Sequence, residues 1–506
     1  MKAKRILATI LAAVLSAGAL TSCGGTKVAT GENELSIFMH FFGYCVYNEE
    51  WPIFKKAEEL TGIKLTGIAS ETVSDSSQAY NTMLVSNKLP DIIHYSVSNL
   101  ERLATDGGLM ELDELIEEHG PNIKKFFEEY PDAKEDSSVN GKVYYIVGSN
   151  SGIERGGKPA VQKGWFIRTD WLKKLGLEVP KNVDEFYNVM KAFREQDPNG
   201  NGKKDEIPMF ERQEGITSYL QLFGAENLWF INNEGEYVHG KIQEEYKNAM
   251  KILQKWYAEG LIDPEIYTRG QQSREQLLGQ NIGGLTHDWF SSTAAFNDKY
   301  TETIPGFEFL PMTPPADVNG KVKEVTTRPT FHGMAWGLSK DCKDPVAAIK
   351  YLDFWLSDEG KRLISYGVEG VHYNMVDGKP VFSDLVLNSE TGVPTFMRNQ
   401  GQVEIGSILA IDAEMMGMNE IGRKGFEEYI ENGYAVERPS FSLTTDESVE
   451  IGKIMTNIDT YMKEMQQKWI MGEADVDATW DEYIATIEGM DYQRAKKIYN
   501  DAIARG

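Results

Sequence analysis

The chain is long, acidic and poor in cysteine. It has 506 residues, and 52 Lys and Arg against 77 Asp and Glu give a formal net charge of −25. Nucleic acids and anionic lipid surfaces attract clustered Lys and Arg, so this balance argues against both as partners. A chain of this length exceeds what one hydrophobic core organises, and we therefore expect two or more lobes.

The amino terminus has the pattern of a secretory signal peptide. A basic start at residues 2–5 precedes an uncharged apolar stretch at residues 6–20, which is too short to span a bilayer stably. Residues 20–23, Leu-Thr-Ser-Cys, resemble the lipobox of bacterial lipoproteins. That resemblance implies removal of residues 1–22 and a lipid anchor on Cys23. An ordinary signal peptide with an incidental cysteine is the alternative.

The next segment, residues 23–33, has almost nothing apolar to bury and is predicted to be a flexible tether. Beyond it the chain is expected to be a soluble globular protein, since the whole sequence is 41% hydrophobic and 25% charged and has no later apolar segment of membrane-spanning length. Cys45 and Cys342 are far apart in sequence and do not form a disulfide framework, so we expect two free thiols, with a single bridge between them as the alternative.

From residue 34 onward, strand-like runs alternate with amphipathic helices, which predicts α/β lobes. The first unit has a strand at residues 35–39, a helix begun by Pro52 and ended by Gly62, and a strand at residues 64–68. After another strand at residues 142–147, we expect a second lobe to begin.

The second lobe is predicted to open with a strand at residues 165–168 and a helix at residues 170–175 that Gly176 ends. Asn182 and Glu185 then have the spacing of a capping box at the start of the next helix.

The loop at residues 197–206, Asp-Pro-Asn-Gly-Asn-Gly-Lys-Lys-Asp-Glu, repeats oxygen-bearing side chains at every second position. This spacing suits a hard cation, and calcium fits best, in a structural role. An EF-hand would place a bidentate Glu six residues beyond Gly202, where Pro208 stands, so the loop is not a full EF-hand. A solvated turn of Asn, Asp and Gly is the alternative. The expected ligands are Asp197, Asn199, Asn201, Lys203, Asp205 and Glu206.

Several separate stretches resemble the family 1 extracellular solute-binding proteins. The resemblance is narrower to the LplA- and YtcQ-like lipoproteins and more distant to the alginate-oligosaccharide-binding proteins. The stretches cover most of the chain, and their order and spread carry the resemblance. They are residues 89–92, 107–113, 168–172, 197–206, 344–353, 359–360, 367–373 and 480–489.

This resemblance implies an α/β protein with a two-lobed, periplasmic-binding-protein-like (type II, venus-flytrap) fold that holds its ligand as the lobes close. By analogy, the amino-terminal lobe takes residues 34–150 and about 282–365, and the carboxy-terminal lobe takes about 151–281 and 366–506. Alginate-type relatives hold calcium on the loop matching residues 197–206, which supports the calcium interpretation.

Sugar recognition calls for aromatic rings that stack on C–H faces and planar polar groups that pair with hydroxyls. The chain has 10 Trp and 23 Tyr, several in predicted loops at strand ends, where open α/β sheets bind ligands. Each ring alone is more often core packing than a sugar platform. The candidate ligand-binding residues are Tyr47, Tyr95, Trp165, Arg168, Trp229, Asp288, Trp289, Trp336, Glu369 and Tyr373.

Together these features predict a non-enzymatic, monomeric substrate-binding lipoprotein that captures a carbohydrate by lobe closure and delivers it to the permease of an ABC importer. A surface glycoside hydrolase or polysaccharide lyase is an alternative that needs paired carboxylates, and the acidic composition always offers some pair. A binding protein for a peptide or another small solute is a further alternative, because a fold does not fix its ligand.

Overall fold

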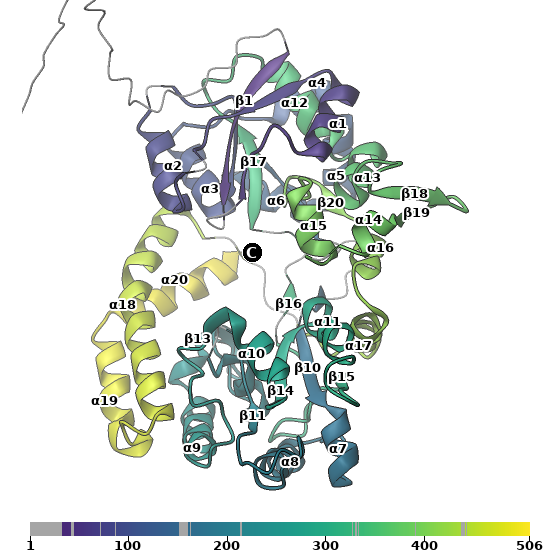
Figure 1. Cartoon of the computed structure of the whole chain (residues 1–506). Helices are drawn as coiled ribbons and strands as arrows, with labels where there is room; N and C mark the ends of the chain where they lie inside the picture. Colours follow the sequence, from purple (N-terminus) through teal and green to yellow (C-terminus); the bar gives the residue numbers. More distant parts are fainter. Residues whose placement is uncertain are drawn as a thin grey trace, which may run out of the picture.

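The structure is a computed structural model that describes residues 33–505, apart from gaps at 42–44, 71, 87, 151–159, 162, 213–214, 326, 329–330, 332, 390, 437–440 and 442. The predictions for the signal peptide and Cys23, and all but the last residue of the predicted tether, lie outside the described residues. Figure 1 shows two lobes, one above the other, with helices around a sheet in each. We call them the first and the second lobe.

The first lobe is built on a mixed sheet with the strand order β2-β1-β4-β17-β7, and β3 pairs with β1. Strands β3 and β4 run parallel to β1, whereas β17 is antiparallel to both β4 and β7. The buried side chains of this lobe form one hydrophobic core. Its strands are β1 (Glu34–Phe41), β2 (Cys45–Val46), β3 (Lys64–Gly67), β4 (Ile92–Ser96), β5 (Ser138–Val139), β6 (Lys142–Val143), β7 (Tyr145–Val147), β8 (Ser149–Asn150), β17 (Met334–Leu338), β18 (Tyr373–Val376), β19 (Lys379–Phe382) and β20 (Ile408–Leu409).

Helices cover this sheet and continue toward the second lobe (Figure 1). They are α1 (Pro52–Thr61), α2 (Ser76–Leu84), α3 (Val97–Thr105), α4 (Asp113–His119), α5 (Pro121–Glu129), α6 (Pro131–Asp136), α12 (Pro345–Phe354), α13 (Asp358–Tyr366), α14 (Asp384–Leu387), α15 (Val393–Asn399) and α16 (Ile411–Met416).

The second lobe has a four-stranded sheet in the order β11-β14-β10-β15. Side chains of β10 alternate between two cores: Trp165 and Ile167 pack on one face of the sheet and Phe166 on the other. Its strands are β9 (Ala160–Val161), β10 (Lys163–Arg168), β11 (Ile207–Met209), β12 (Trp229–Ile231), β13 (Tyr237–His239), β14 (Gly283–Trp289), β15 (Phe309–Met312) and β16 (Thr327–Arg328).

Most helices of the second lobe contribute side chains to the core on the Trp165 side of this sheet, and the last three form a carboxy-terminal group (Figure 1). The helices are α7 (Thr169–Leu175), α8 (Val183–Glu195), α9 (Glu244–Ala258), α10 (Ser273–Gly279), α11 (Phe290–Tyr300), α17 (Glu420–Glu431), α18 (Thr445–Ile470), α19 (Val476–Glu488) and α20 (Tyr492–Arg505). Short 3₁₀ helices lie at Thr217–Phe223, Gly240–Ile242 and Gly270–Gln272.

The chain passes between the lobes three times: between β8 and β9, between β16 and β17, and between α16 and α17. The expected return to the first lobe at about residue 282 differs from this arrangement, because β14 pairs with β10 inside the second sheet. The return begins instead with β17. It also extends past residue 365, since Tyr373, Met397 and Ile408 belong to the core of the first lobe.

Local sequence explains where several helices begin and end. Gly62 and Gly176 end α1 and α7 in the left-handed conformation, with φ of 69° and 67°, as predicted. The Asn182 side chain accepts a hydrogen bond from the Glu185 main-chain amide at 3.0 Å. The Glu185 carboxylate accepts from the main-chain amide of Lys181 and the side-chain amide of Asn182, both at 2.9 Å, and not from the main-chain amide of Asn182. The predicted capping box is therefore confirmed on one side only.

Two further observations concern the predicted context of the chain. Cys45 and Cys342 are both free thiols. Among the helices of residues 33–505 that the structure describes, none combines the length and apolar character needed to cross a membrane.

Candidate functional site

In the first lobe, the carboxyl ends of the parallel strands face the second lobe. Strand β17 follows directly after a passage between the lobes, so its first residue, Met334, lies at the lobe boundary. Met334 pairs with Ser96, which places the end of β4 at the same edge. Because β1 runs parallel to β4, β1 also ends there, at Phe41.

The second lobe presents matching strand ends. Strand β10 begins at the lobe boundary, and its first residue, Lys163, pairs with Trp289, the last residue of β14. Strand β11 is parallel to β14 and ends on the same side. Open α/β sheets bind ligands outside the carboxyl ends of their strands, so the candidate site lies between these two edges.

A charge cluster stands at the edge of the second sheet. The guanidinium of Arg212, three residues beyond β11, donates to both carboxylate oxygens of Asp288 at 3.0 and 3.1 Å. Arg274 of α10 lies 3.4 Å from the same carboxylate. Asp288 is 2% exposed and Arg274 is also buried, whereas the Arg212 side chain is 24% exposed. Arg212 is therefore the member of the cluster that meets solvent.

Trp289 comes directly after Asp288 and is half-buried. Its main-chain amide donates to the Asp288 carboxylate at 2.8 Å, which fixes the end of β14 to the charge cluster. A half-buried tryptophan and a guanidinium that are both tied to Asp288 can offer the two chemistries that sugar recognition needs: an apolar face and directed donors.

On the first lobe, small polar groups stand at the start of α3. The Asn99 amide donates to the Ser96 hydroxyl at 2.7 Å, and the Tyr80 hydroxyl donates to the main-chain oxygen of Asn99 at 3.2 Å. Tyr95 does not reach out from this edge, because its ring is buried and stacks on Tyr80 with centroids 4.3 Å apart. This wall therefore offers hydroxyl and amide groups.

Most predicted sugar-binding rings lie in the cores, where their faces are covered by neighbours. Trp165 and Trp336 are both 0% exposed. Trp165 packs on Phe186, Tyr219 and His287, and Trp336 packs on His94, Tyr351 and Trp355. Trp229 lies among Tyr237, His239, Tyr492 and Tyr499, and Tyr47 among Trp51 and Phe54.

The other predicted residues lie away from the two strand edges. Arg168 ends β10 opposite to Lys163; it is 1% exposed, pairs with both oxygens of Asp170 and lies 4.5 Å from the rings of Trp171 and Phe307. Tyr373 donates to Glu369 at 3.4 Å near the β18–β19 hairpin, which projects outward from the first lobe (Figure 1). Of the ten candidates, Asp288 and Trp289 are brought together at the lobe boundary.

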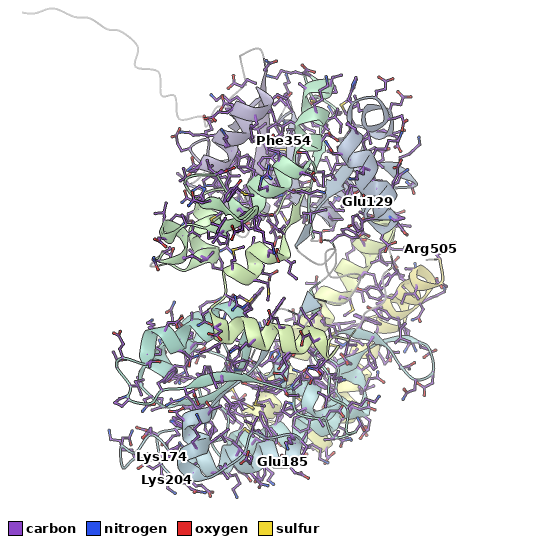
Figure 2. The ribbon with its side chains drawn as sticks, turned by 90° about the vertical axis from the view of Figure 1, so that its right-hand side faces the viewer. Glu129, Lys174, Glu185, Lys204, Phe354 and Arg505 are labelled. Carbon is purple, nitrogen blue, oxygen red and sulfur yellow. The ribbon has the colours of Figure 1, made fainter. Side chains whose placement is uncertain are left out.

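The predicted calcium loop lies at the far end of the second lobe, where Figure 2 shows Lys174 and Lys204. Asp197 adopts φ of 47°, and its carboxylate accepts from the amides of Asn201 and Gly202 at 3.0 and 2.9 Å. Asp205 accepts from the side-chain amides of Asn199 and Asn201 at 3.1 Å. Side-chain oxygens thus converge on the loop interior.

Glu206 is the unusual member of this loop. It is 0% exposed, and among the described residues no side chain donates a hydrogen bond to either carboxylate oxygen. Burial raises the pKa of Glu206, and the charges of Asp197 and Asp205 add to that effect. Only the main-chain amides of Glu206 and Asn199 act to lower that pKa, and a buried carboxylate with so little compensation fits a cation ligand. In the described part of the chain, no group of three or more His, Cys, Asp or Glu side chains forms a ready metal site. Calcium would rely on amide and main-chain oxygens as well.

The pairing of two arginines with Asp288 could not be predicted from the sequence. Arg212 and Arg274 stand 62 residues apart and meet only because β11 and α10 flank β14. The sequence offered one indication that Arg212 could belong to the site: this residue follows the short strand β11.

Comparisons with known proteins agree with this architecture. A family model described as "Bacterial extracellular solute-binding protein" matches residues 49–362. Lipoprotein LipO of Bacillus subtilis (strain 168) is 25% identical over 496 residues, covering 93% of each chain. The fructooligosaccharide ABC transporter substrate-binding protein FusA of Streptococcus pneumoniae serotype 4 is 26% identical over 488 residues, covering 89% of this chain and 86% of that protein.

Among solved structures, the alginate-binding protein AlgQ2, determined without calcium ion, has a TM-score of 0.82 and 33% sequence identity. The likeness covers 94% of this chain and 99% of that one. It confirms the two-lobed type II fold expected from the sequence.

Proposed function

Because the chain belongs to the bacterial extracellular solute-binding proteins, we propose that it is the substrate-binding lipoprotein of an ABC importer and captures an oligosaccharide between its lobes. The observation that carries this proposal is the pair of strand edges that face each other across the lobe boundary, one bearing Trp289 and Arg212 and the other Ser96 and Asn99. FusA and AlgQ2, which bind oligosaccharide and alginate by their names, support the ligand class.

The mechanism has no chemical step. Ligand that touches both edges favours the closed arrangement by its differential contacts with the two lobes. Trp289 supplies the stacking face, and Arg212 supplies donors that its pairing with Asp288 holds in a fixed direction. The closed form then docks on the permease, where ATP is hydrolysed by the importer's own subunits.

The loop at residues 197–206 is the proposed calcium site. Asp197, Asn199, Asn201, Asp205 and Glu206 would supply side-chain oxygens and Lys203 its main-chain oxygen. The burial of the Glu206 carboxylate, with no side-chain donor on it among the described residues, supports this assignment. Because the loop lies at the far end of the lobe from the strand edges, calcium would stabilise the lobe and would not contact the sugar (Figure 2).

Attachment to the outer face of the cell membrane would come from lipid on Cys23, and the protein would act as a monomer. The likeness to a lipoprotein along 93% of the chain supports this part of the proposal.

The test is calorimetric titration with a panel of neutral and acidic oligosaccharides, with the same mixtures assayed for cleavage. We expect binding of intact sugar, and we expect Trp289→Ala to weaken it about fivefold or more, if the loss is of the order of 1–3 kcal/mol, as it is for a base stacked on an aromatic side chain. Tyr187→Ala is the matched control, because Tyr187 is a half-buried ring on α8 at the far end of the same lobe. Cleaved sugar would establish an enzyme instead, and no binding of any sugar would overturn the ligand class.

A further inference from the structure

A group of exposed apolar side chains lies on the β18–β19 hairpin and on α14, which packs against β19. Six of the sixteen large apolar side chains that the described residues expose lie within residues 371–387, each between 37% and 56% exposed. Single exposed apolar residues are normal on a protein surface, whereas a group of neighbouring ones marks an interaction site. We call this group the hairpin patch: Val371, Met375, Val376, Val381, Leu385 and Leu387.

The base of the hairpin is fixed to the first lobe by two aromatic side chains. Tyr373 and Phe382 pair across the two strands, and both are buried. Their rings pack on Tyr366 of α13, with centroids 5.8 and 5.6 Å from that ring. The Ser383 hydroxyl donates to the main-chain oxygen of Val371 at 2.8 Å and closes the base. These contacts hold the projecting hairpin in one orientation on the lobe (Figure 1).

The tip of the hairpin exposes apolar side chains on both of its faces. The Asp377–Gly378 turn has φ of 50° and 78°, the positive values that a type I′ hairpin turn requires. Paired residues share a face, so Met375 lies with Pro380 on one face. Val376 lies with Lys379 on the other face. Met375 and Val376 are both exposed, so the first lobe covers neither side chain.

The charge and the size of the hairpin narrow the kind of partner. Within residues 373–382 the charged side chains are Asp377 and Lys379, so the hairpin is neutral on a chain whose net charge is −25. Two copies of so acidic a chain repel each other, and an anionic lipid surface repels it as well. A stable dimer takes about 20–30 residues from each side, far more than the hairpin patch supplies. These features favour a brief contact with an apolar protein surface.

Pro380 limits strand pairing at the edge of β19. A proline has no N–H to donate, and a strand edge that carries one resists pairing with a strand from another chain. The hairpin therefore offers its side chains to a partner, and strand addition by a second copy of this chain is disfavoured.

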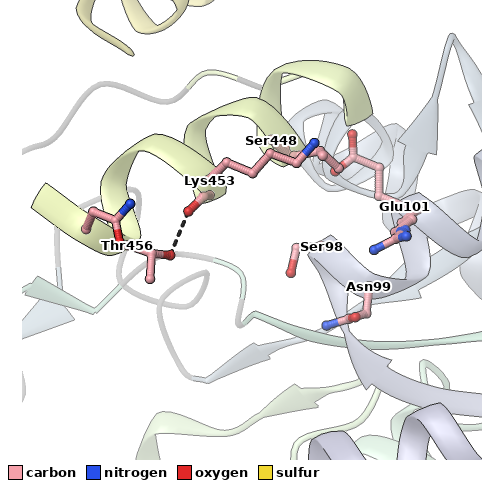
Figure 3. A pocket seen from close by; sticks show the side chains of 10 residues that line it. Ser98, Asn99, Glu101, Ser448, Lys453 and Thr456 are labelled. Carbon is pink, nitrogen blue, oxygen red and sulfur yellow. Dashed lines mark hydrogen bonds between the residues drawn. The ribbon is translucent and has the colours of Figure 1, made fainter. Parts of the chain in front are cut away.

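The opposite side of the lobe boundary has a different surface. There α3 and α18 line a mostly polar pocket, and Figure 3 shows Ser98, Asn99 and Thr456 among its residues. Hydroxyl and amide groups of this kind are well satisfied by water. The exposed apolar group is therefore a property of the hairpin side and not of the lobe boundary in general (Figure 1).

We propose that the hairpin patch is a surface by which the first lobe docks on the extracellular loops of the importer's permease, with the hairpin tip in an apolar recess of that partner. This inference rests on the proposed function, which supplies the permease as a partner. Delivery needs a contact that forms and breaks in every cycle. Apolar side chains on a preformed hairpin suit that need, because their burial favours association while little order has to be imposed on them.

The first experiment replaces Val376 of the full-length chain with the photo-crosslinker benzoylphenylalanine, in the cells that make the protein. Mass spectrometry then identifies the cross-linked product. We expect a transmembrane subunit of an ABC permease. The control carries the crosslinker at Val85, which is 83% exposed at the end of α2 in the same lobe, and should not capture that subunit. A second copy of this chain, a lipid adduct, any other protein or no product at position 376 would overturn the proposal.

The second experiment adds a charge to the hairpin patch. In the chain with the crosslinker at position 376, Val381→Glu should lower the yield of the permease product at least about fivefold, because a carboxylate loses its hydration in an apolar recess. Val85→Glu, the same change outside the patch, should leave the yield within about twofold. Equal yields from the two variants would contradict docking through the patch.

The oligosaccharide panel separates this proposal from the capture of sugar. Purified Val381→Glu should bind the panel as the wild type does, because the hairpin lies away from the strand edges. Weaker sugar binding in this variant would show that the patch acts on the cleft instead. A permease product from a protein that binds no sugar in the panel would support the docking surface and overturn the ligand class. Sugar binding together with a product from another partner would do the reverse.

Discussion

The imidazole Nε2 of His287 lies 2.8 Å from the Glu324 carboxylate, and both side chains are 0% exposed. His287 stands on β14 one residue before Asp288, so this pair supports the strand that carries the charge cluster. Removing one partner leaves the other buried without its counterpart. We expect Glu324→Ala to lower the free energy of unfolding by about 3–5 kcal/mol, measured by urea denaturation.

Glu427→Ala is the control for this measurement, because Glu427 is an exposed carboxylate on α17 of the same lobe. Its change should stay within about 0.5 kcal/mol. Equal effects of the two substitutions would show that the buried pair contributes no more to stability than an exposed carboxylate does.

Asp136 ends α6, where burial raises its pKa from 3.8 to about 6, with Glu135 and Asp132 adding to the shift. Because the folded pKa lies above the unfolded value, the charged carboxylate destabilises the folded state at neutral pH, and the penalty is relieved as pH falls from about 6 toward 3.8. Asp136→Asn should therefore raise the Tm at neutral pH. The gain should shrink through this window, and a gain that is the same on both sides of it would refute the assignment.

The buried tryptophans should separate stability from binding. Trp336 is enclosed by Tyr351 and Trp355, so Trp336→Ala should lower the free energy of unfolding by about 3–5 kcal/mol. Trp336→Phe and Trp165→Phe should destabilise less and leave oligosaccharide affinity within about twofold of wild type. A large loss of oligosaccharide affinity in either Phe variant, with the free energy of unfolding unchanged, would show that the tryptophan contacts the ligand.

Calcium should raise the Tm of the wild-type protein, and chelator should reverse the gain. Glu206→Gln tests the loop directly. Its neutral side chain removes the burial penalty of the carboxylate, so without calcium at neutral pH the variant should be at least as stable as wild type. With calcium the order should reverse, because the amide is a weaker ligand. A calcium shift that Glu206→Gln leaves intact would place the ion elsewhere.

The sequence predicted much of the fold because helix ends and buried faces depend on residues that are close together in the chain. Glycines at 62 and 176 end their helices as expected, and the strands near residues 35, 64 and 165 are present with small changes of boundary. Helical spacing predicts a buried stripe of Ile53, Phe54, Ala57 and Leu60 in α1, and the first three are buried whereas Leu60 is 39% exposed. Alternation and helical period decide which face is buried, and both are visible in a single sequence.

The binding residues were harder to predict, because an aromatic residue at a strand end suits a core as well as a cleft. Trp165 and Trp289 illustrate the point: both lie on strands of the second sheet at the lobe-boundary end, yet Trp165 turns into the core and Trp289 remains half-exposed. The pairing of Arg212 with Asp288 depends on contacts across 76 residues of sequence. The lobe assignment of β14 likewise depended on strand pairing that the sequence does not reveal.

Strand β17 has a consequence for how the chain folds after it leaves the ribosome. It lies between β4 and β7, with Leu338 beside Ile92 and Gly337 beside Tyr145. The first-lobe sheet is therefore in two parts, with unpaired edges on β4 and β7, until β17 has been synthesised. Strand β17 follows the whole β9–β16 region in the chain. Long-range pairing of this kind is slow, and open edges invite aggregation. A chain whose central strand is among the last to be synthesised would therefore be protected by chaperones that cover these edges while it folds.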